Sequence, residues 1–187
     1  MRMAALRRLA ACLLVASSAL AVRAADAATP PPQEYAVKAA FLYHFAHLVD
    51  WPGVADPSEP FVIGVVGTDP FGATLDEVLA GKSVRGQPVR IQRLAGLAPL
   101  EDLRLQILFV GRGDEEMVRR ALAAVASKPV LTVGESPRFA ERGGMIGFRM
   151  TDDGRVSFDI NLQRAEQAGL RMRSQLLKLA RIVETAR

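Results

Sequence analysis

The sequence of 187 residues has one cysteine, Cys12, and two histidines, His44 and His47. Because Cys12 lies in a segment that we expect to be removed on export, the mature chain lacks thiols. This excludes disulfide bonds, thiol catalysis and thiolate metal sites. The two histidines are three positions apart, but neither a cysteine nor a further histidine is present to complete a transition-metal site. We therefore expect no metal and no cofactor.

Motifs of catalysis and nucleotide binding are missing as well. The sequence has no Gly-x-Ser-x-Gly nucleophile elbow and no Gly-x-Gly-x-x-Gly dinucleotide pattern. Gly81-Lys82-Ser83 has the form of the end of a phosphate loop, but Asp76 stands where that loop needs its first glycine. We therefore expect a protein that is not an enzyme, and an exported hydrolase is the weakest of our three hypotheses.

The first 27 residues have the pattern of a secretory signal peptide. A basic start is followed by an apolar stretch over residues 9–22, which is too short for a membrane span of about 20 residues. Ala25-Asp26-Ala27 fits the cleavage rule, with Val22-Arg23-Ala24 as second choice. Residues 9–12 also resemble a lipoprotein box, but two arginines abut it directly, so ordinary cleavage is favoured. We expect a cleaved signal peptide over 1–27 and a protein of the periplasm.

The excess of positive over negative charge is small once this leader is removed. The chain has 24 Lys and Arg against 20 Asp and Glu, and four of the arginines and one aspartate lie in residues 1–27. The mature chain then has a net charge of only +1, so the basic isoelectric point does not indicate a nucleic-acid partner. The mature sequence contains no run long and apolar enough to span a membrane.

After a proline-rich lead-in over residues 28–33, the pattern predicts one domain over 34–187. Strand–turn–helix units recur three times, which is typical of an α/β fold with a mostly parallel sheet sandwiched by helices. Asp153-Gly154 predicts a tight turn in one antiparallel hairpin at an edge of the sheet. Asn161 is expected to cap a short helix. The expected helices are 34–49, 71–79, 115–126 and 174–186, and the expected strands are 61–66, 89–94, 105–110, 130–133, 145–150 and 155–160.

A candidate ligand site lies near the last expected helix. Arg171 and Arg173 alternate in an extended segment, so both point to one side, immediately before a helix that Ser174 is expected to cap. Two guanidinium groups beside free helix N–H donors favour a small anion or carboxylate. Glu135 joins this candidate set because it follows a strand at the sheet edge where parallel sheets bind ligands. The alternative is a pair of solvated arginines flanking a helix start.

Several blocks of the chain resemble the YfiR/HmsC-like family of periplasmic proteins. The likeness covers essentially the whole mature chain. Its blocks are residues 34–45 closed by Val49-Asp50-Trp51-Pro52, then 131–136, 139–146, 156–162, 168–171 and 176–180.

This resemblance implies a non-enzymatic regulator with an α/β sandwich fold. The best-understood members of the family dimerise and bind the periplasmic sensory domain of an inner-membrane diguanylate cyclase, holding it inactive. Repression then lowers cyclic-di-GMP and biofilm formation. Some members tune this repression through disulfides, which a mature chain without cysteine cannot do. A signal must therefore arrive here by ligand, pH, partner or envelope state, and the partner itself can differ.

Two functional readings remain open for the candidate surfaces. Tyr43 and Trp51 flank the end of the first expected helix, and they either anchor a partner protein or simply pack on the sheet. As an alternative to the regulator, the chain is a periplasmic small-ligand-binding module that uses Arg171 and Arg173. The two functions are compatible if the ligand tunes the partner.

Overall fold

The computed structural model describes residues 32–52, 58–101 and 103–186. The expected signal peptide and residues 28–31 of the lead-in lie outside these residues. The first helix begins at Pro32, two residues earlier than expected, because proline is favoured in the first turn of a helix. Within the described ranges, no helix is long and apolar enough to cross a membrane.

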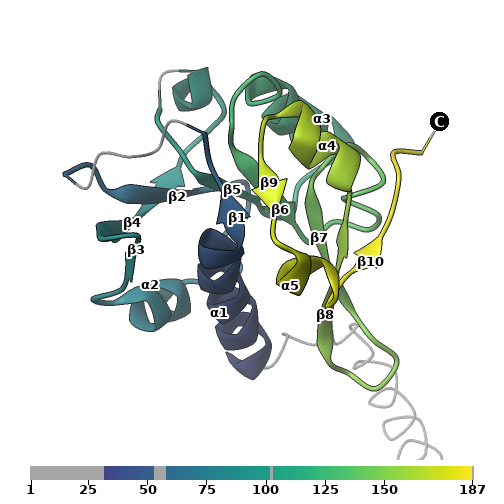
Figure 1. Ribbon diagram of the computed structural model, residues 1–187, viewed down its shortest axis with the longest axis horizontal. Helices are drawn as coiled ribbons and strands as arrows, with labels where there is room; N and C mark the ends of the chain where they lie inside the picture. The colour runs from purple at the N-terminus through teal and green to yellow at the C-terminus, as the bar shows by residue number, and fades with distance from the viewer. Residues whose placement is uncertain (1–31, 53–57, 102, 187) are drawn as a thin grey trace, which may run out of the picture. The chain divides into compact units, whose positions relative to one another are not determined.

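The described residues form an alternating series of helices and strands, coloured by position in Figure 1. The helices are α1 (Pro32–Leu48), α2 (Ala73–Leu79), the 3-10 turn η1 (Ala98–Glu101), α3 (Glu115–Ala124), α4 (Leu162–Gln167) and α5 (Ser174–Leu177). The strands are β1 (Val49–Asp50), β2 (Phe61–Val66), β3 (Ser83–Val84), β4 (Gln87–Leu94), β5 (Ile107–Val110), β6 (Leu131–Gly134), β7 (Ile146–Met150), β8 (Val156–Ile160), β9 (Arg171–Met172) and β10 (Arg181–Ile182).

In the described part of the chain, eight of these strands form one sheet in the order β10-β8-β7-β6-β5-β2-β4-β3. The central strands β4, β2, β5, β6 and β7 are parallel, and β7–β8 is the expected antiparallel hairpin. The expected α/β class with a mostly parallel sheet is therefore confirmed. A second antiparallel pair, β3–β4, ends the sheet on one side, and β10 lies outside the hairpin on the other.

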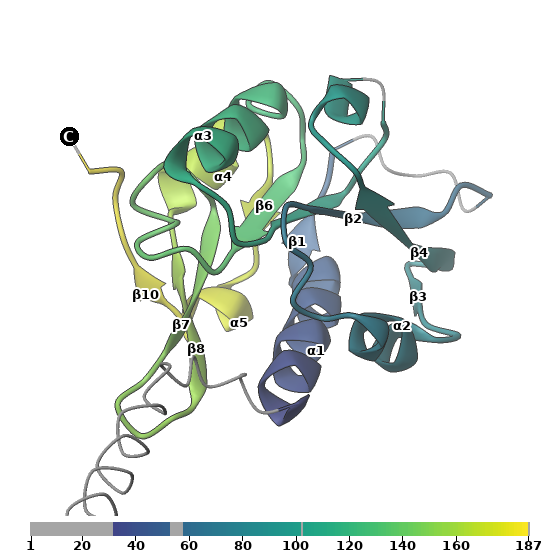
Figure 2. The ribbon, with the colours of Figure 1, turned by 180° about the vertical axis from the view of Figure 1, so that it is seen from behind.

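The burial of β2 explains its uninterrupted apolar sequence. All six of its residues are buried, and alternate side chains enter two separate cores. Phe61, Ile63 and Val65 face the core under α1 and α2, whereas Val62 and Val66 face the core under η1 and α3. In Figure 2, α1 and α2 lie below β2, and α3 lies above it. The helices thus cover both faces of the sheet.

The expected helix over residues 174–186 is wrong beyond its first turn. Helix α5 ends at Leu177, and the chain then enters β10. The residues that suggested an apolar stripe do not share a buried face, since Leu176 is buried but Leu179 is 65% exposed. Ser174 is also not the cap: it is the first helical residue, and Arg173 occupies the capping position. By contrast, the Asn161 side chain accepts the Arg164 N–H at the start of α4, as expected.

A small two-stranded sheet lies at the end of α1. Strand β1 follows α1 directly and pairs antiparallel with β9, which places Asp50 opposite Arg171. The backbone N–H of Arg173 continues this ladder by donating to the Leu48 carbonyl at 2.9 Å. In consequence, the two arginines predicted as ligand residues are held beside the last turn of α1.

Candidate functional site

Two arginines bind one carboxylate at the β1–β9 pair, and a third arginine lies opposite that residue in the ladder. We call Arg85, Arg171, Arg173 and Asp50 the arginine cluster. Arg173 Nη2 lies 3.1 Å from Asp50 Oδ1, and Arg85 Nη2 contacts the same oxygen and also the Val49 carbonyl at 3.1 Å. Arg171 lies opposite Asp50 in the ladder and makes no ion pair with any residue of the described ranges. The cluster therefore has two positive charges in excess.

Neighbouring ionisable groups respond to this positive charge. The guanidinium groups of Arg173 and Arg85 hold the pKa of Asp50 below its usual range. On α1, burial lowers the pKa of His47, and the charges of His44, Arg85 and Arg173 lower it further. A surface with this excess of guanidinium donors suits a carboxylate or phosphate group. Ser174 begins α5 beside the arginine cluster. Because that helix has only four residues, its N-terminus is not counted as part of an anion site.

Glu135 belongs to a different set of charges, at the carboxyl end of β6. Its side chain is only 3% exposed and accepts from Lys38 Nζ at 2.7 Å and Arg112 Nε at 3.2 Å. Lys38 Nζ also lies 2.5 Å from Glu34 Oε1, one turn earlier on α1. We call Glu34, Lys38, Arg112 and Glu135 the buried ion cluster. Burial alone lowers the pKa of Lys38, but its bonds to the two glutamates outweigh this and raise it.

The structure does not bring Glu135 together with the predicted arginines. Glu135 contacts α1 through Lys38, whereas the Arg173 N–H donates to the carbonyl of Leu48, the last residue of α1. At 1.5 Å per residue, these two points of α1 are about 15 Å apart. Glu135 therefore ties the start of α1 to the sheet, and the arginine cluster stands at the other end of the helix.

The usual ligand position of a parallel sheet is filled by backbone here. The order of the strands reverses at β2: the chain passes from β2 to β4 on one side of it and then to β5 on the other. Parallel sheets open a crevice at the strand ends where this reversal occurs. In this protein the Thr68 N–H donates to the Arg112 carbonyl at 3.1 Å across that position. A Cβ atom on Gly111 would lie 2.0 Å from the Thr68 oxygen, so only glycine allows this approach. What remains there is an open cavity of about 480 Å³ beside Met117.

The two aromatic residues proposed as partner anchors have different surroundings. Trp51 is 6% exposed, stacks edge-on against Phe61, and donates its indole N–H to the Gln106 carbonyl at 3.1 Å. It packs on the sheet, which is the alternative that the sequence left open. Tyr43 is partly exposed; its hydroxyl donates to the Ser83 carbonyl at 3.1 Å, and Lys82 Nζ lies 5.5 Å from its ring centre. Of the two, only Tyr43 offers surface beside the arginine cluster.

Sequence reasoning missed two members of the arginine cluster. Arg85 lies in the turn between β3 and β4 with a positive φ of 53°, followed by Gly86 at 85°. An arginine at the first position of such a turn gives no sequence signal, because asparagine and glycine are the residues expected there. Asp50 stood in a block that we quoted only for its family resemblance. Within the described residues, no group of three histidine, cysteine or acidic side chains is arranged to hold a metal ion.

Comparison with known proteins places the chain in a family. Among solved structures, a conserved domain protein from Vibrio cholerae O1 biovar El Tor strain N16961 is 14% identical, with a TM-score of 0.47. The match covers 65% of this chain and 54% of that protein, so the chain spans about half the length of that protein. A likeness of this size says nothing about function. Residues 35–181, which include both ion clusters apart from Glu34, match the description YfiR/HmsC-like. The chain therefore belongs to the YfiR/HmsC-like family.

Proposed function

We propose that the protein is a periplasmic regulator that binds the periplasmic domain of an inner-membrane diguanylate cyclase and holds the cyclase inactive. The observation that carries this proposal is the family match over residues 35–181, because the family is generally regulatory rather than catalytic. The expected signal peptide supports the compartment. Lower cyclic-di-GMP and weaker biofilm formation would follow from repression.

The physical basis of such repression is a difference in affinity. A regulator shifts the cyclase to its inactive state only if it binds that state more tightly than the active one. The surface that we assign to this contact is Tyr43 with the adjoining arginine cluster. It combines a partly exposed aromatic side chain with guanidinium groups, which are the residue types enriched at the centres of protein interfaces. We further propose that the protein acts as a homodimer.

The proposal is tested by capture and by activity. The exported, processed chain is immobilised, and the periplasmic domain of a diguanylate cyclase encoded beside its gene is passed over it. Retention, together with lower cyclic-di-GMP when both full-length proteins are co-expressed, supports the proposal. The variants Y43A and R171A should weaken retention, whereas R155A, in the exposed turn between β7 and β8, should not. Absence of retention by any membrane cyclase of the same cell, or an uncleaved chain in the cytosol, contradicts it.

A second candidate function is a small-ligand-binding module at the arginine cluster. The observation that favours it is the excess of guanidinium groups over carboxylates, since Asp50 pairs with Arg85 and Arg173 and lies opposite Arg171 in the ladder. We assign Arg171 and Arg173 to the ligand and add Arg85, while Ser174 and Glu135 stay outside the contact. Citrate and inorganic phosphate serve as probes in a thermal shift assay. R171A and R173A should abolish the stabilisation that R155A retains. Equal stabilisation of all three variants contradicts an anion site here.

A further inference from the structure

Asp50 lies on the same face of the β1–β9 pair as two arginines of the arginine cluster. Residues directly opposite each other in an antiparallel pair project to one side with Cβ atoms about 4.5–5.5 Å apart, and Arg171 is the residue opposite Asp50. Arg173 follows two positions later in extended conformation, so it projects to that side as well. Arg85 reaches the Asp50 carboxylate from the turn between β3 and β4. The carboxylate therefore lies between two guanidinium groups, with a third projecting from the neighbouring position.

The ion pairs of Asp50 are open to solvent. Arg173 Nη2 lies 3.1 Å from Asp50 Oδ1, and Arg85 Nη2 contacts that same oxygen. The side chain of Asp50 is 44% exposed, and those of Arg85 and Arg173 are 36% and 51% exposed. Exposed ion pairs contribute little to stability, because water and dissolved ions replace them readily. A dissolved anion can therefore reach both guanidinium groups at the cost of releasing one exposed carboxylate.

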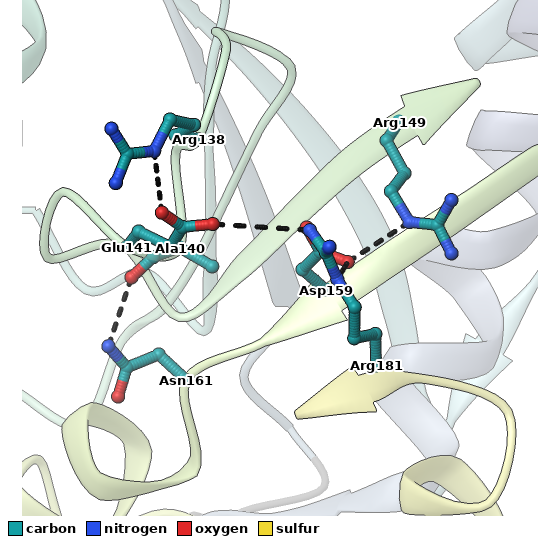
Figure 3. Close-up of polar contacts among 7 residues, drawn as sticks. All are labelled: Arg138, Ala140, Glu141, Arg149, Asp159, Asn161 and Arg181. Atoms are coloured by element: carbon teal, nitrogen blue, oxygen red, sulfur yellow. Dashed lines mark hydrogen bonds and ion pairs between the residues drawn. The ribbon is translucent and has the colours of Figure 1, made fainter. Parts of the chain in front are cut away.

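The carboxylate of Asp159 shows the opposite arrangement (Figure 3). Its side chain is 10% exposed, and Arg181 donates to both of its oxygens, through Nε at 2.9 Å and Nη2 at 2.6 Å. Arg149 Nε donates to it at 3.0 Å. A buried carboxylate held by two parallel bonds ties its strands together and leaves no room for a solute. Asp50 differs in both respects: it is held through one oxygen at the surface, and Arg171 stands beside it without an ion pair to any described residue.

We propose that Asp50 is a built-in competitor for the ligand of the arginine cluster: its carboxylate occupies the place between Arg85 and Arg173 that an anionic group of a small ligand takes, and the ligand displaces it. A free monocarboxylate makes no contact there that Asp50 does not already make, and Asp50 is tethered, which gives it an effective concentration of about the millimolar range. A ligand that also reaches Arg171 gains a further guanidinium group. Asp50 thereby selects ligands with more than one anionic oxygen pair or charge, such as phosphate, over monocarboxylates.

The direction of the effect of D50N separates this role from a structural one. The substitution removes the negative charge and keeps the size of the side chain. Repulsion between two charges about 4 Å apart in a fully hydrated site corresponds to about fivefold in affinity, and to more where water is partly excluded, so we expect phosphate to bind D50N about tenfold more tightly. If Asp50 instead serves only to hold Arg85 and Arg173 in position, D50N weakens phosphate binding. This inference rests on the second candidate function, the anion site.

NMR titration of the processed chain measures both affinity and position. Inorganic phosphate and acetate are added separately at one pH, and the backbone amide signals of residues 171–173 are followed. We expect the wild type to respond to phosphate and not to acetate, and D50N to respond to both. D50E restores the charge and should bind phosphate more weakly than D50N. The matched control is D153N, which removes a carboxylate from the exposed ion pair with Arg155 between β7 and β8 and should leave the phosphate affinity unchanged.

The possible failures of the inference and of the anion site are distinguishable. Phosphate binding that is no tighter in D50N than in the wild type, or that tightens equally in D153N, overturns the inference, while loss of binding in R171A still supports the anion site. Acetate binding to the wild type as tightly as phosphate overturns the selection assigned to Asp50. D50S repeats the comparison with a second neutral side chain, and an opposite result from D50S also overturns the inference. If no variant responds to phosphate, the anion site and the inference both fail.

Discussion

Lys38 is the residue on which we expect the stability of the buried ion cluster to depend most. Its ammonium group lies between Glu34 and Glu135, whose side chains are 11% and 3% exposed. The variant K38M retains an apolar side chain for the rings of Tyr35 and Phe148 but removes the charge. Glu135 then keeps the Tyr35 hydroxyl at 3.4 Å and the guanidinium of Arg112, whose side chain is 68% exposed.

We expect K38M to lower the free energy of unfolding, because it leaves two buried carboxylates with too little positive charge beside them. Removing one partner of a buried ion pair costs about 3–5 kcal/mol, and we expect the lower end, about 3 kcal/mol, because Arg112 still contacts Glu135. For a chain of this size, that corresponds to a fall in Tm of about 6–12 °C. K178M, which removes an exposed lysine, should change the free energy of unfolding by less than about 0.5 kcal/mol.

Urea denaturation followed by circular dichroism measures these differences. Adding E135Q to K38M removes the stranded charge, so the double variant should recover at least half of the loss. The contribution of Lys38 should also depend on pH. Because its pKa is raised in the folded chain, its stabilisation is fully present at neutral pH and is lost as the pH rises through that raised value. Equal stability of K38M and K178M, or a double variant no more stable than K38M, would refute the reasoning.

Other predictions concern single positions. G111A should destabilise the fold by about 2–3 kcal/mol in urea denaturation, since its Cβ would meet the Thr68 oxygen, whereas G96A, with open space around it, should not; equal effects would count against the close approach. R173A should raise the pKa of His47, measured by NMR titration, because the Arg173 charge lowers it; an unchanged pKa would contradict any contribution of Arg173. Asp153 should titrate at about 2 because Arg155 and Thr151 donate to it, and R155A should move that pKa upward; a value unmoved by R155A contradicts this cause.

The parts of the fold that sequence predicted well are those set by local chemistry or by burial on both faces. The run from Phe61 to Val66 predicts a central strand because every residue in it must avoid water. Asp153-Gly154 and Asn161 act through turn and cap geometry that involves only neighbouring residues. These signals do not depend on which residues lie across the sheet. The local sequence is therefore enough to predict the strand, the turn and the cap.

The errors occurred where a distant charge decides the conformation. Residues 174–186 have apolar residues at helical spacing. However, Arg181 donates to Asp159, 22 positions earlier, and lies in strand β10 there. Lys38 lies on the buried side of α1 because Glu135 is opposite it, whereas the apolar side chain of its neighbour Val37 is exposed. In the arginine cluster, Arg171 and Arg173 were found from alternation, but Asp50 and Arg85 come from other segments. Periodicity within a segment carries no information about such pairings.

The hydrogen bond from Thr68 to Arg112 has a mechanical consequence for the sheet. It joins the second residues beyond β2 and β5, so these two strands are tied together past the end of their own ladder. Bending of one half of the sheet against the other would have to break this tie and move Gly111 away from the Thr68 oxygen. The sheet should therefore move as one rigid body. A force applied at one edge strand would rotate the whole sheet and would not bend it at the junction of β2 and β5.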